Sequence, residues 1–350
     1  MTKKKLLILT QKVNRNDPIL GFFCAWIREL SGEFQFVTVI CLETGEYSPP
    51  SNVSVFSLGK KGGRSSRLRY MIRFWKLIFS KRKNYDLVLV HMNQEYTLLG
   101  GFIWWAMRKP VYMWRNHHTG SWLTGLSSLF CRRVFYTSRS SYTARYRKSM
   151  QMPAGIDTDF FCRQATISKN PRSILFLGRL DPSKRLDILV EALREVSRYE
   201  KNLSVLLYGA PSDVSSLRYV NNIKSRVQTY GLGDIFFFCG LVPNHETVNI
   251  YNASGIFVNL SPDGMFDKTI FEAMACETTV LVSNRHLCEL FDARMCFSYG
   301  NSHELADKIR TLLLLDHQSI ADFGRKLRRI VVDQHDLKLL TRQLAAVMSK

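Results

Sequence analysis

The stretch "LSPDGMFDKTIFEAMACETTVLVSN", residues 260–284, contains the end of one apolar strand, a loop, a helix and a second apolar strand. The loop holds Pro262 and Gly264, residue types that favour turns. This order of elements is typical of a parallel α/β sheet. One acid, Glu272, stands in the early turns of the otherwise apolar helix "IFEAMA". It indicates either a hydrogen-bonding role or a capping or surface position.

The same alternation of short apolar runs with helical patterns extends from 5 to 138 and again from 173 to 284. It predicts parallel sheets with crossover helices, and the uniformly apolar strands predict sheets that are covered on both faces. The segment "MPAGIDTDFF", residues 152–161, interrupts the alternation with Pro and Gly. The fold class is therefore α/β, with two doubly wound domains that bind ligands at the carboxyl ends of their strands.

The expected first domain is 1–153 and the second is 154–335. A C-terminal helix at 336–350 is expected to pack back on the first domain.

The composition is that of a globular protein of 350 residues, 46% hydrophobic and with a net charge of +20. The charge is uneven: Met1 to Pro153 contains 25 Lys+Arg and 7 Asp+Glu, whereas Ala154 to Lys350 contains 24 and 22. The first half is therefore expected to meet a polyanion or an anionic surface.

The densest basic segment, from Lys60 to Lys83, holds ten Lys+Arg and no acid. Within it, Leu68, Met71, Ile72, Trp75 and Phe79 recur at helical spacing, with basic residues at the same spacing beside them. An amphipathic helix of this kind suits an anionic membrane surface. The alternative is that its apolar side is the core face and its charges are solvated.

The eight cysteines contain no CxxC pair and lie mostly in apolar runs, so we expect free thiols of an intracellular protein. The most apolar run, "LLGGFIWWAM" at 98–107, is too short to span a bilayer. The apolar run after the basic N-terminus is too short for a signal peptide. The expected location is the cytoplasm, peripheral on the inner membrane face.

In "LFLGRLDPSKRLDILVEAL", residues 175–193, Gly178 ends a strand, and Arg179 and Lys184 stand five apart before a helix. Two cations and nearby backbone N–H groups can bind a diphosphate there, with a solvated basic loop as the alternative. The N-terminus of the helix that holds Glu272 offers further N–H groups, and the Glu272 carboxylate can accept hydrogen bonds from the vicinal hydroxyls of a ribose.

These two stretches, together with "PAGIDTDFF" and "FFFCGLVPNHETVNIYNASGIFVNLSP", resemble the retaining glycosyltransferases of family 4, which have the GT-B fold. The resemblance covers residues 152–284 and weakens in the first half. It implies two Rossmann-like domains facing a central cleft. The domain at 1–153 would face the acceptor and the membrane, and the domain at 154–335 would bind the nucleotide-sugar. It also implies transfer of a sugar from a nucleotide-sugar with retained anomeric configuration, with no metal and no cofactor besides this co-substrate. We expect the donor to be a UDP-sugar.

The resemblance also implies roles for individual residues. Arg179 and Lys184 would bind the diphosphate and stabilise it as it leaves. Glu272 would match the second Glu of the family's E-x7-E motif, and Val242 and Pro243, after Leu241, would frame the nucleobase.

The chain departs from the family pattern at Gly264, where the first Glu of that motif would stand. Contact with the donor sugar is therefore expected to pass to Asp267 or Lys268. Glu277 and Thr279 replace the usual Gly and Pro after "EAMAC".

In the first half, "YMWRNHHTGSW" follows a strand, and a histidine near this position lies beside the reacting sugar in the family. We favour His117 for contact with substrate hydroxyls, with His118 and His91 as alternatives. Gly21, in the loop after the first strand, is the candidate for approach to the donor phosphate. Asp-x-Asp within "IDTD" matches the interdomain linker, so we expect it to be structural and predict no metal site.

The predicted function is retaining transfer of a sugar from a UDP-sugar to a membrane-presented glycan or glycolipid. The alternatives are a nucleic-acid-binding protein, which the basic first half would suit, and a GT-B binding subunit without activity, because the first motif Glu is absent.

Overall fold

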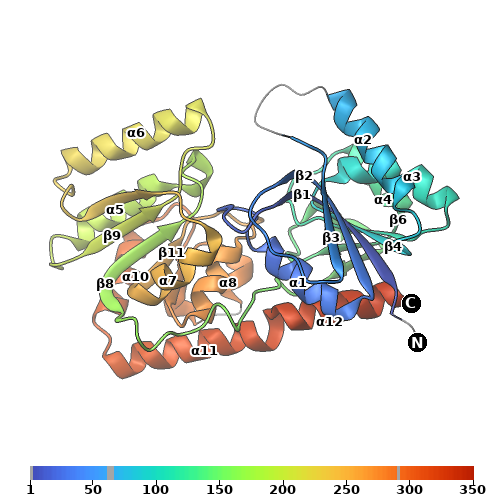
Figure 1. The fold of residues 1–350 in the computed structure, drawn as a ribbon. Coiled ribbons are helices and arrows are strands. Elements are labelled where there is room, and N and C mark those ends of the chain that lie inside the picture. The colour runs from blue at the N-terminus through green and yellow to red at the C-terminus, as the bar shows by residue number, and fades with distance from the viewer. Residues whose placement is uncertain (1–2, 61–66, 290–291) are drawn as a thin grey trace. The chain divides into compact units, whose positions relative to one another are not determined.

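The computed structural model describes residues 3–60, 67–289 and 292–350. Contacts divide the chain into two compact units, which Figure 1 shows. The first unit contains Met1–Gly155, Pro243–His245 and Asp336–Lys350, and the second contains Ile156–Val242 and Glu246–His335.

The first unit is built on a seven-stranded, fully parallel sheet in the order β3-β2-β1-β4-β5-β6-β7. Its strands are β1 (Lys5–Val13), β2 (Phe36–Thr44), β3 (Val53–Ser57), β4 (Leu87–His91), β5 (Val111–Trp114), β6 (Cys131–Tyr136) and β7 (Ser149–Gln151). Its α-helices are α1 (Phe23–Glu33), α2 (Arg67–Ser80), α3 (Gln94–Ala106), α4 (Trp122–Phe130) and α12 (Leu337–Ser349). A 3₁₀ turn, η1 (Tyr142–Arg145), precedes β7.

Helices cover both faces of this sheet, as the uniformly apolar strands require. On one face, α1 and α12 pack together over the sheet through residues such as Trp26 and Leu340. On the other face, α2 and α3 bury Phe74 and Trp104, and α4 packs against α3. Alternate residues of β1 to β6 belong to the two cores, so both sides of each central strand are removed from water.

The second unit has a five-stranded parallel sheet in the order β10-β9-β8-β11-β12. Its strands are β8 (Asn170–Leu177), β9 (Ser204–Tyr208), β10 (Phe236–Gly240), β11 (Ser254–Asn259) and β12 (Thr279–Val282). Its α-helices are α5 (Leu186–Val196), α6 (Val214–Thr229), α7 (Thr247–Ala253), α8 (Lys268–Ala275), α9 (Arg285–Cys288), α10 (Ser302–Leu313) and α11 (His317–His335). Its 3₁₀ turns are η2 (Pro182–Lys184) and η4 (Ala293–Met295), and η3 (Asn244–Glu246) crosses the division between the units.

The core of the second unit follows from helical periodicity. In α5, Leu186, Leu189, Val190 and Leu193 recur at the spacing of one helix face, and all four are buried against the sheet with α6 and α10. The opposite face of the sheet is covered by α7, α8 and α11. This arrangement leaves the loops after β8 and β11 at one edge, because the carboxyl ends of parallel strands lie together.

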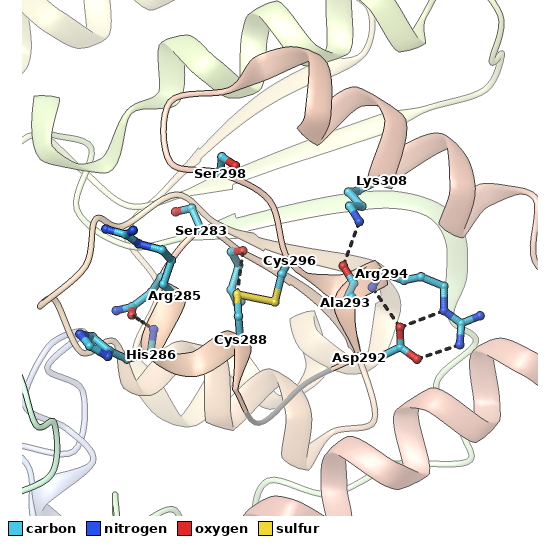
Figure 2. The surroundings of a disulfide bond; sticks show 12 residues. Ser283, Arg285, His286, Cys288, Asp292, Ala293, Arg294, Cys296, Ser298 and Lys308 are labelled. Carbon is cyan, nitrogen blue, oxygen red and sulfur yellow. Dashed lines mark hydrogen bonds and ion pairs between the residues drawn. A yellow bond between two sulfur atoms is a disulfide. The ribbon is translucent and has the colours of Figure 1, made fainter.

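The predicted α/β class with two parallel, doubly wound sheets is confirmed. Two short edge strands, β3 and β7, were not predicted. The prediction of free thiols is wrong for two cysteines: Figure 2 shows Cys288 joined to Cys296 by a disulfide, with a Cα–Cα distance of 5.8 Å. The two are eight positions apart in sequence, and η4 brings Cys296 back beside the end of β12. Spacing alone does not predict this approach, because it depends on the fold. The other six cysteines are free.

At the end of α8, Glu277 adopts an unfavourable backbone conformation at one of the positions that differ from the family pattern. The Glu277 N–H donates to the carbonyl of Met274, and the Thr278 N–H to that of Ala273, which together form a Schellman cap. This cap requires a left-handed residue, and Glu277 has φ +57°. A side chain in that conformation costs about 1 kcal/mol relative to glycine.

Glu277→Gly is therefore expected to increase the free energy of unfolding by about 1 kcal/mol, because glycine adopts the left-handed conformation without steric cost. Chemical denaturation monitored by circular dichroism measures the change. Glu277→Ala is the matched control: it removes the carboxylate but keeps the Cβ, so stability should stay close to that of the wild type. Equal stabilisation by both variants would show that the charge, not the backbone, carries the cost.

Candidate active site

The carboxyl edge of the second sheet brings together a lysine and an aspartate from loops more than 80 residues apart. Lys184 Nζ lies 2.6 Å from Asp267 Oδ2 and 2.8 Å from Ser261 Oγ. The Lys184 side chain is almost wholly buried, although lysine is rarely buried without a partner. The pair therefore fixes the loop after β8 to the loop after β11.

The local sequence explains how Lys184 reaches this position. Asp181 precedes the 3₁₀ turn η2, and its Oδ1 accepts a hydrogen bond of 3.0 Å from the backbone N–H of Ser183. Arg185 then adopts the left-handed conformation, with φ +46°, and turns the chain into α5. Lys184 thus stands at the end of a capped turn, with its side chain directed to the strand edge.

Asp267 is held as a carboxylate. Burial raises the pKa of Asp267, but the Lys184 ammonium and hydrogen bonds from Lys184, Ser261 and Asn259 outweigh burial and lower this pKa below its ordinary value. The described bonds converge on Oδ2, and Asn259 Nδ2 donates to it over 2.8 Å. The Lys184–Asp267 pair is therefore neutral as a unit and rigidly placed.

Arg179 is more exposed than Lys184. Its side chain is 55% exposed, and its Nε lies 3.5 Å from Asp181 Oδ2. It stands directly after Gly178 at the end of β8. A long guanidinium with this exposure can move to meet an anionic ligand, whereas Lys184 is held in place.

Lys268 and Glu272 are one turn apart on α8 and so lie on the same helix face. Burial lowers the pKa of Lys268 to about 7, and the Glu272 charge opposes this shift. Lys268 therefore titrates near neutrality. It stands in the first turn of α8, where backbone N–H groups have no intrahelical partner.

Glu272 is buried, with 3% of its surface exposed, so the alternative of a surface or capping glutamate is wrong. The hydroxyl of Tyr251, on α7, donates to Glu272 Oε2 over 3.0 Å. Tyr251 is fully buried, and burial followed by the Glu272 charge raises its pKa well above the ordinary value. Tyr251 therefore stays a hydrogen-bond donor and fixes the carboxylate. Sequence reasoning missed it because nothing in "NHETVNIYNAS" distinguishes its hydroxyl from that of another core tyrosine.

Gly264 occupies the position of the absent first motif Glu, and its backbone has φ +93°. Side-chain-bearing residues rarely adopt this conformation, so the loop differs from a motif that carries Glu there. The preceding Asp263 is bound elsewhere, since its Oδ2 accepts from Arg285 Nε and its Oδ1 from the Arg285 backbone N–H, both over 2.7 Å. Figure 2 shows Arg285 near the Cys288–Cys296 disulfide.

Val242 and Pro243 lie in the loop after β10, where Gly240 has φ +78° and Leu241 is exposed. This loop is at the same edge of its sheet as Arg179 and Lys184. The division between the two units falls between Val242 and Pro243.

The first unit has its own pocket at the carboxyl ends of its strands, with a volume of about 430 Å³. It is lined by Gln11, Lys12, Asp17, Ile19, Leu20, Leu42, Glu43, Lys60, His91, Met92, Asn93, Arg115 and His117. Lys12 is bound between Asp17 and Glu43, at 2.9 and 3.1 Å. The pocket thus contains the ion-paired Lys12, Asp17 and Glu43 and two further cations, Arg115 and Lys60.

The three candidate histidines differ in their surroundings. His91 is buried, stacks on Phe23 at a centroid distance of 3.9 Å and has its Nδ1 3.0 Å from Thr10 Oγ1. His117 is exposed, stacks on His118 and has its Nδ1 2.7 Å from Thr119 Oγ1. His91 and His117 line the pocket, so His117 is the one of these two that is open to solvent.

Gly21 closes the loop after β1. Its N–H donates to the Asp17 carbonyl, and a Cβ at this position would lie 2.5 Å from that oxygen and 2.7 Å from the Arg15 carbonyl. Only glycine fits without moving the backbone. Gly21 therefore shapes the rim near Asp17 and Leu20, which line the pocket.

Two further findings concern metals and membranes. Within residues 3–60, 67–289 and 292–350, no group of three or more His, Cys, Asp or Glu side chains is arranged to hold a metal ion. Asp157 of "IDTD" instead accepts a hydrogen bond from the Phe160 N–H over 3.2 Å. Across the same described residues, no helix has the length and apolar character needed to cross a bilayer.

The two parallel-sheet units define a GT-B fold, the class of many sugar-transferring enzymes. HepE of Anabaena in complex with UDP superimposes with a TM-score of 0.76 at 19% identity over 99% of each chain. Sucrose-phosphate synthase of Thermosynechococcus elongatus gives 0.75 at 17% identity, over 99% of this chain and 98% of the other.

Residues 157–329 match the family model of the glycosyl transferases group 1. Mannosylfructose-phosphate synthase of Agrobacterium fabrum is 32% identical over 112 residues, 31% of this chain and 25% of that protein. The alpha-monoglucosyldiacylglycerol synthase of Streptococcus pneumoniae is 21% identical over 286 residues, 70% of this chain and 63% of its own length. Each match thus spans less than two thirds of the relative.

Proposed function

We propose that this protein transfers a sugar from a nucleotide-sugar to an acceptor hydroxyl with retention of anomeric configuration, as a family 4 enzyme. The observation that carries the proposal is the cluster at the edge of the second sheet. There the buried Lys184 is paired with the partly exposed Asp267. The exposed Arg179 follows β8 and the Tyr251-bound Glu272 lies on α8, all within the segment that matches the family model. UDP in the similarly folded HepE supports uracil as the base of the donor.

In this proposal the diphosphate lies against the first turn of α8. Arg179 moves from Asp181 to contact it with two N–H groups, and Lys184 supplies a fixed positive centre. Because Asp267 neutralises part of the Lys184 charge, Arg179 and Lys268 carry most of the attraction to the anion. Val242 and Pro243 contact the nucleobase.

Glu272 holds the ribose. Tyr251 occupies one carboxylate oxygen, so the carboxylate is oriented before the ligand arrives, and it accepts hydrogen bonds from the vicinal hydroxyls. Asp267 and Lys268 were both candidates for contact with the donor sugar. We favour Lys268, because the described hydrogen bonds of Asp267 already hold it to Lys184, Ser261 and Asn259.

The reaction is a front-face substitution. The acceptor oxygen forms a bond to the anomeric carbon on the side from which the diphosphate leaves, the carbon–oxygen bond to the diphosphate breaks, and the acceptor proton passes to the departing phosphate oxygen. Arg179 and Lys184 stabilise the negative charge that develops on this oxygen. His117, with Gly21 shaping the nearby loop, contacts the substrate hydroxyls. The reaction uses no metal and no cofactor besides the nucleotide-sugar.

The acceptor is proposed to be a membrane-presented glycan or glycolipid bound at the pocket of the first unit. The relative from Streptococcus pneumoniae supports this class, because its name refers to a glucosyldiacylglycerol. In α2, Leu68, Ile72 and Phe79 are exposed, and the core takes Phe74 and Ile78 instead. The core-face alternative is therefore wrong for those three residues.

Exposed apolar residues beside Arg69, Arg73 and Lys76 support contact of α2 with an anionic membrane, and thus a peripheral location on the inner, cytoplasmic face. The part of this basic segment at 61–66 lies outside the described residues.

The nucleic-acid alternative is not favoured, because it does not explain the family match or the cluster around Lys184. The other alternative, an inactive GT-B subunit that binds the donor, would differ from the proposed enzyme only in lacking turnover.

Calorimetric titration with UDP, GDP and ADP is expected to show selective binding of UDP. Glu272→Ala and Lys184→Ala should each weaken it by about 1 to 3 kcal/mol, because each removes a charged hydrogen-bonding group. Lys326→Ala, which removes an exposed lysine of α11, controls for net charge and should bind UDP like the wild type. Absence of nucleotide binding by the folded wild type would contradict the proposed donor site.

The Lys268 amine gives a pH dependence with a defined sign. Its pKa of about 7 means that the positive charge is present below neutrality and lost above it. UDP-glucose, whose diphosphate does not titrate in this range, should bind about tenfold more weakly at about pH 8 than at about pH 6. Lys268→Arg should bind tightly at both values, because guanidinium stays protonated. A flat wild-type profile would exclude Lys268 from the anion site.

A further inference from the structure

The outward faces of α3 and α4 carry five large apolar side chains that the core does not use. Phe102 and Trp105 on α3 are 66% and 69% exposed, and Trp122 and Leu129 on α4 are 75% and 72% exposed. Leu126 lies between the last two at helical spacing and is also exposed. Isolated exposed apolar residues are ordinary, but a group of this size on adjacent helices marks an interaction site.

These residues form one surface because the two helices pack side by side. Thr124 Oγ1 donates to Gln94 Oε1 over 2.7 Å near the start of both helices. Farther along, Gly101 faces the ring of Phe130 closely enough that a Cβ would lie 2.5 Å from it. The helices therefore run alongside each other in the same direction, and we call their exposed apolar residues the α3–α4 surface.

The α3–α4 surface faces outward because the other sides of both helices already pack against the rest of the unit. Trp104 is fully buried, and its Nε1 donates to Tyr85 Oη over 3.2 Å. Ser127 is buried and bonds backbone carbonyls of Gln94 and Leu123. On α3, the rings of Phe102 and Trp105 stack at a centroid distance of 5.6 Å and form a flat aromatic face.

The charge around the α3–α4 surface is mostly positive, although α3 carries one acid, Glu95, in its first turn. From Tyr96 to Ile156 the sequence contains no Asp or Glu, and it contains nine Lys+Arg: Arg108, Lys109, Arg115, Arg132, Arg133, Arg139, Arg145, Arg147 and Lys148. Arg108, Arg132 and Arg133 are exposed. A hollow of about 400 Å³ beside Trp105 is lined by Arg108 and Arg132. An apolar stripe with a cationic border matches the layered chemistry of an anionic lipid surface.

We propose that the α3–α4 surface inserts into an anionic lipid bilayer. The aromatic and leucine side chains enter the boundary between headgroups and acyl chains, and Arg108, Arg132 and Arg133 bind the headgroup phosphates. Tryptophan suits this boundary because its ring is apolar and its N–H is polar. A second copy of the chain is a poorer occupant, since a symmetric contact would place the same cationic border opposite itself.

The α3–α4 surface continues the membrane contact proposed above for α2. Trp75 of α2 donates from Nε1 to the Leu99 carbonyl of α3 over 3.1 Å, so the two helices are neighbours. Figure 1 shows α2, α3 and α4 together in the first unit. Of the 19 large apolar side chains that are exposed in the described chain, eight lie on these three helices. The inference rests on the proposed function only in one respect, because the proposed acceptor would bring the protein to a membrane. Insertion of the α3–α4 surface does not depend on the donor site.

Cosedimentation of the full chain with vesicles tests the proposal. The probes are vesicles of phosphatidylcholine and of phosphatidylcholine mixed with phosphatidylglycerol. The wild type should bind the mixed vesicles, and the double variant Trp105→Ala/Leu129→Glu should bind them at least about tenfold more weakly, because it loses two inserted side chains. Leu314→Glu is the matched control: it adds the same charge at a 76% exposed leucine of the second unit and should bind as the wild type does.

A second variant separates insertion from charge attraction. Arg132→Gln/Arg133→Gln should lose most of its binding to the mixed vesicles at low salt. When the fraction of phosphatidylglycerol in the vesicles is raised, this variant should still insert. Equal binding by the wild type and Trp105→Ala/Leu129→Glu would overturn the proposal, as would a wild type that ignores both vesicles. So would a wild-type dimer in light scattering that the double variant converts to a monomer, since the surface would then bind a second copy.

Calorimetric UDP binding, measured on the same samples, keeps the two proposals distinguishable. Trp105→Ala/Leu129→Glu should bind UDP like the wild type, which also shows that the variant is folded. If the wild type binds vesicles but does not bind UDP, the proposed donor site is rejected and the proposal for the α3–α4 surface remains supported.

Discussion

The ion pair between Lys184 and Asp267 is the constraint on which the candidate site depends. A lysine so nearly buried is tolerable only if its ammonium is matched, and here a carboxylate, a serine hydroxyl and the neighbouring hydrogen bonds of Asn259 match it. The pair joins the loop after β8 to the N-terminus of α8. Arg179, Lys268 and Glu272 take their places from these two elements. If the pair were absent, this link between the two loops would be lost, although each loop keeps its own hydrogen bonds.

The two units differ in how their positive charges are arranged. In the second unit, Arg179 and Lys184 of the candidate site stand after β8 and are each paired with an aspartate, which suits recognition of one small anion. In the first unit, cations are numerous from Tyr47 to Ile156, where the only acids are Asp86 and Glu95. They border helices that expose aromatic and aliphatic side chains. A surface of that kind suits a large anionic partner with an apolar layer. In the proposed function, the second unit therefore binds the donor and the first unit binds the acceptor.

Part of this organisation is readable in the sequence. Uniformly apolar strands separated by helical patterns specify two parallel sheets. The order of the motifs places Arg179 and Lys184 after the end of one strand and Glu272 in the helix that follows another. The partners of these residues are not readable, because contact between positions such as Tyr251 and Glu272, or Lys184 and Asp267, is set by tertiary packing and leaves no local pattern. The conformations of Gly264 and Glu277 are likewise set by a loop and a helix cap. The run at 98–107 was recognised as too short for a membrane span, yet periodicity alone could not show that Phe102 and Trp105 face outward.

Turnover tests the central proposal most directly. Release of UDP from a panel of UDP-sugars would be followed with the wild type and with Arg179→Ala, whose guanidinium is proposed to stabilise the departing diphosphate. We predict that at least one UDP-sugar is consumed, and that Arg179→Ala reduces the rate by about a hundredfold or more, as is usual when a group that stabilises developing charge is removed. A folded wild-type protein that binds UDP but consumes no UDP-sugar, with or without a glycolipid acceptor, would contradict this proposal and identify the chain as a donor-binding subunit without catalysis.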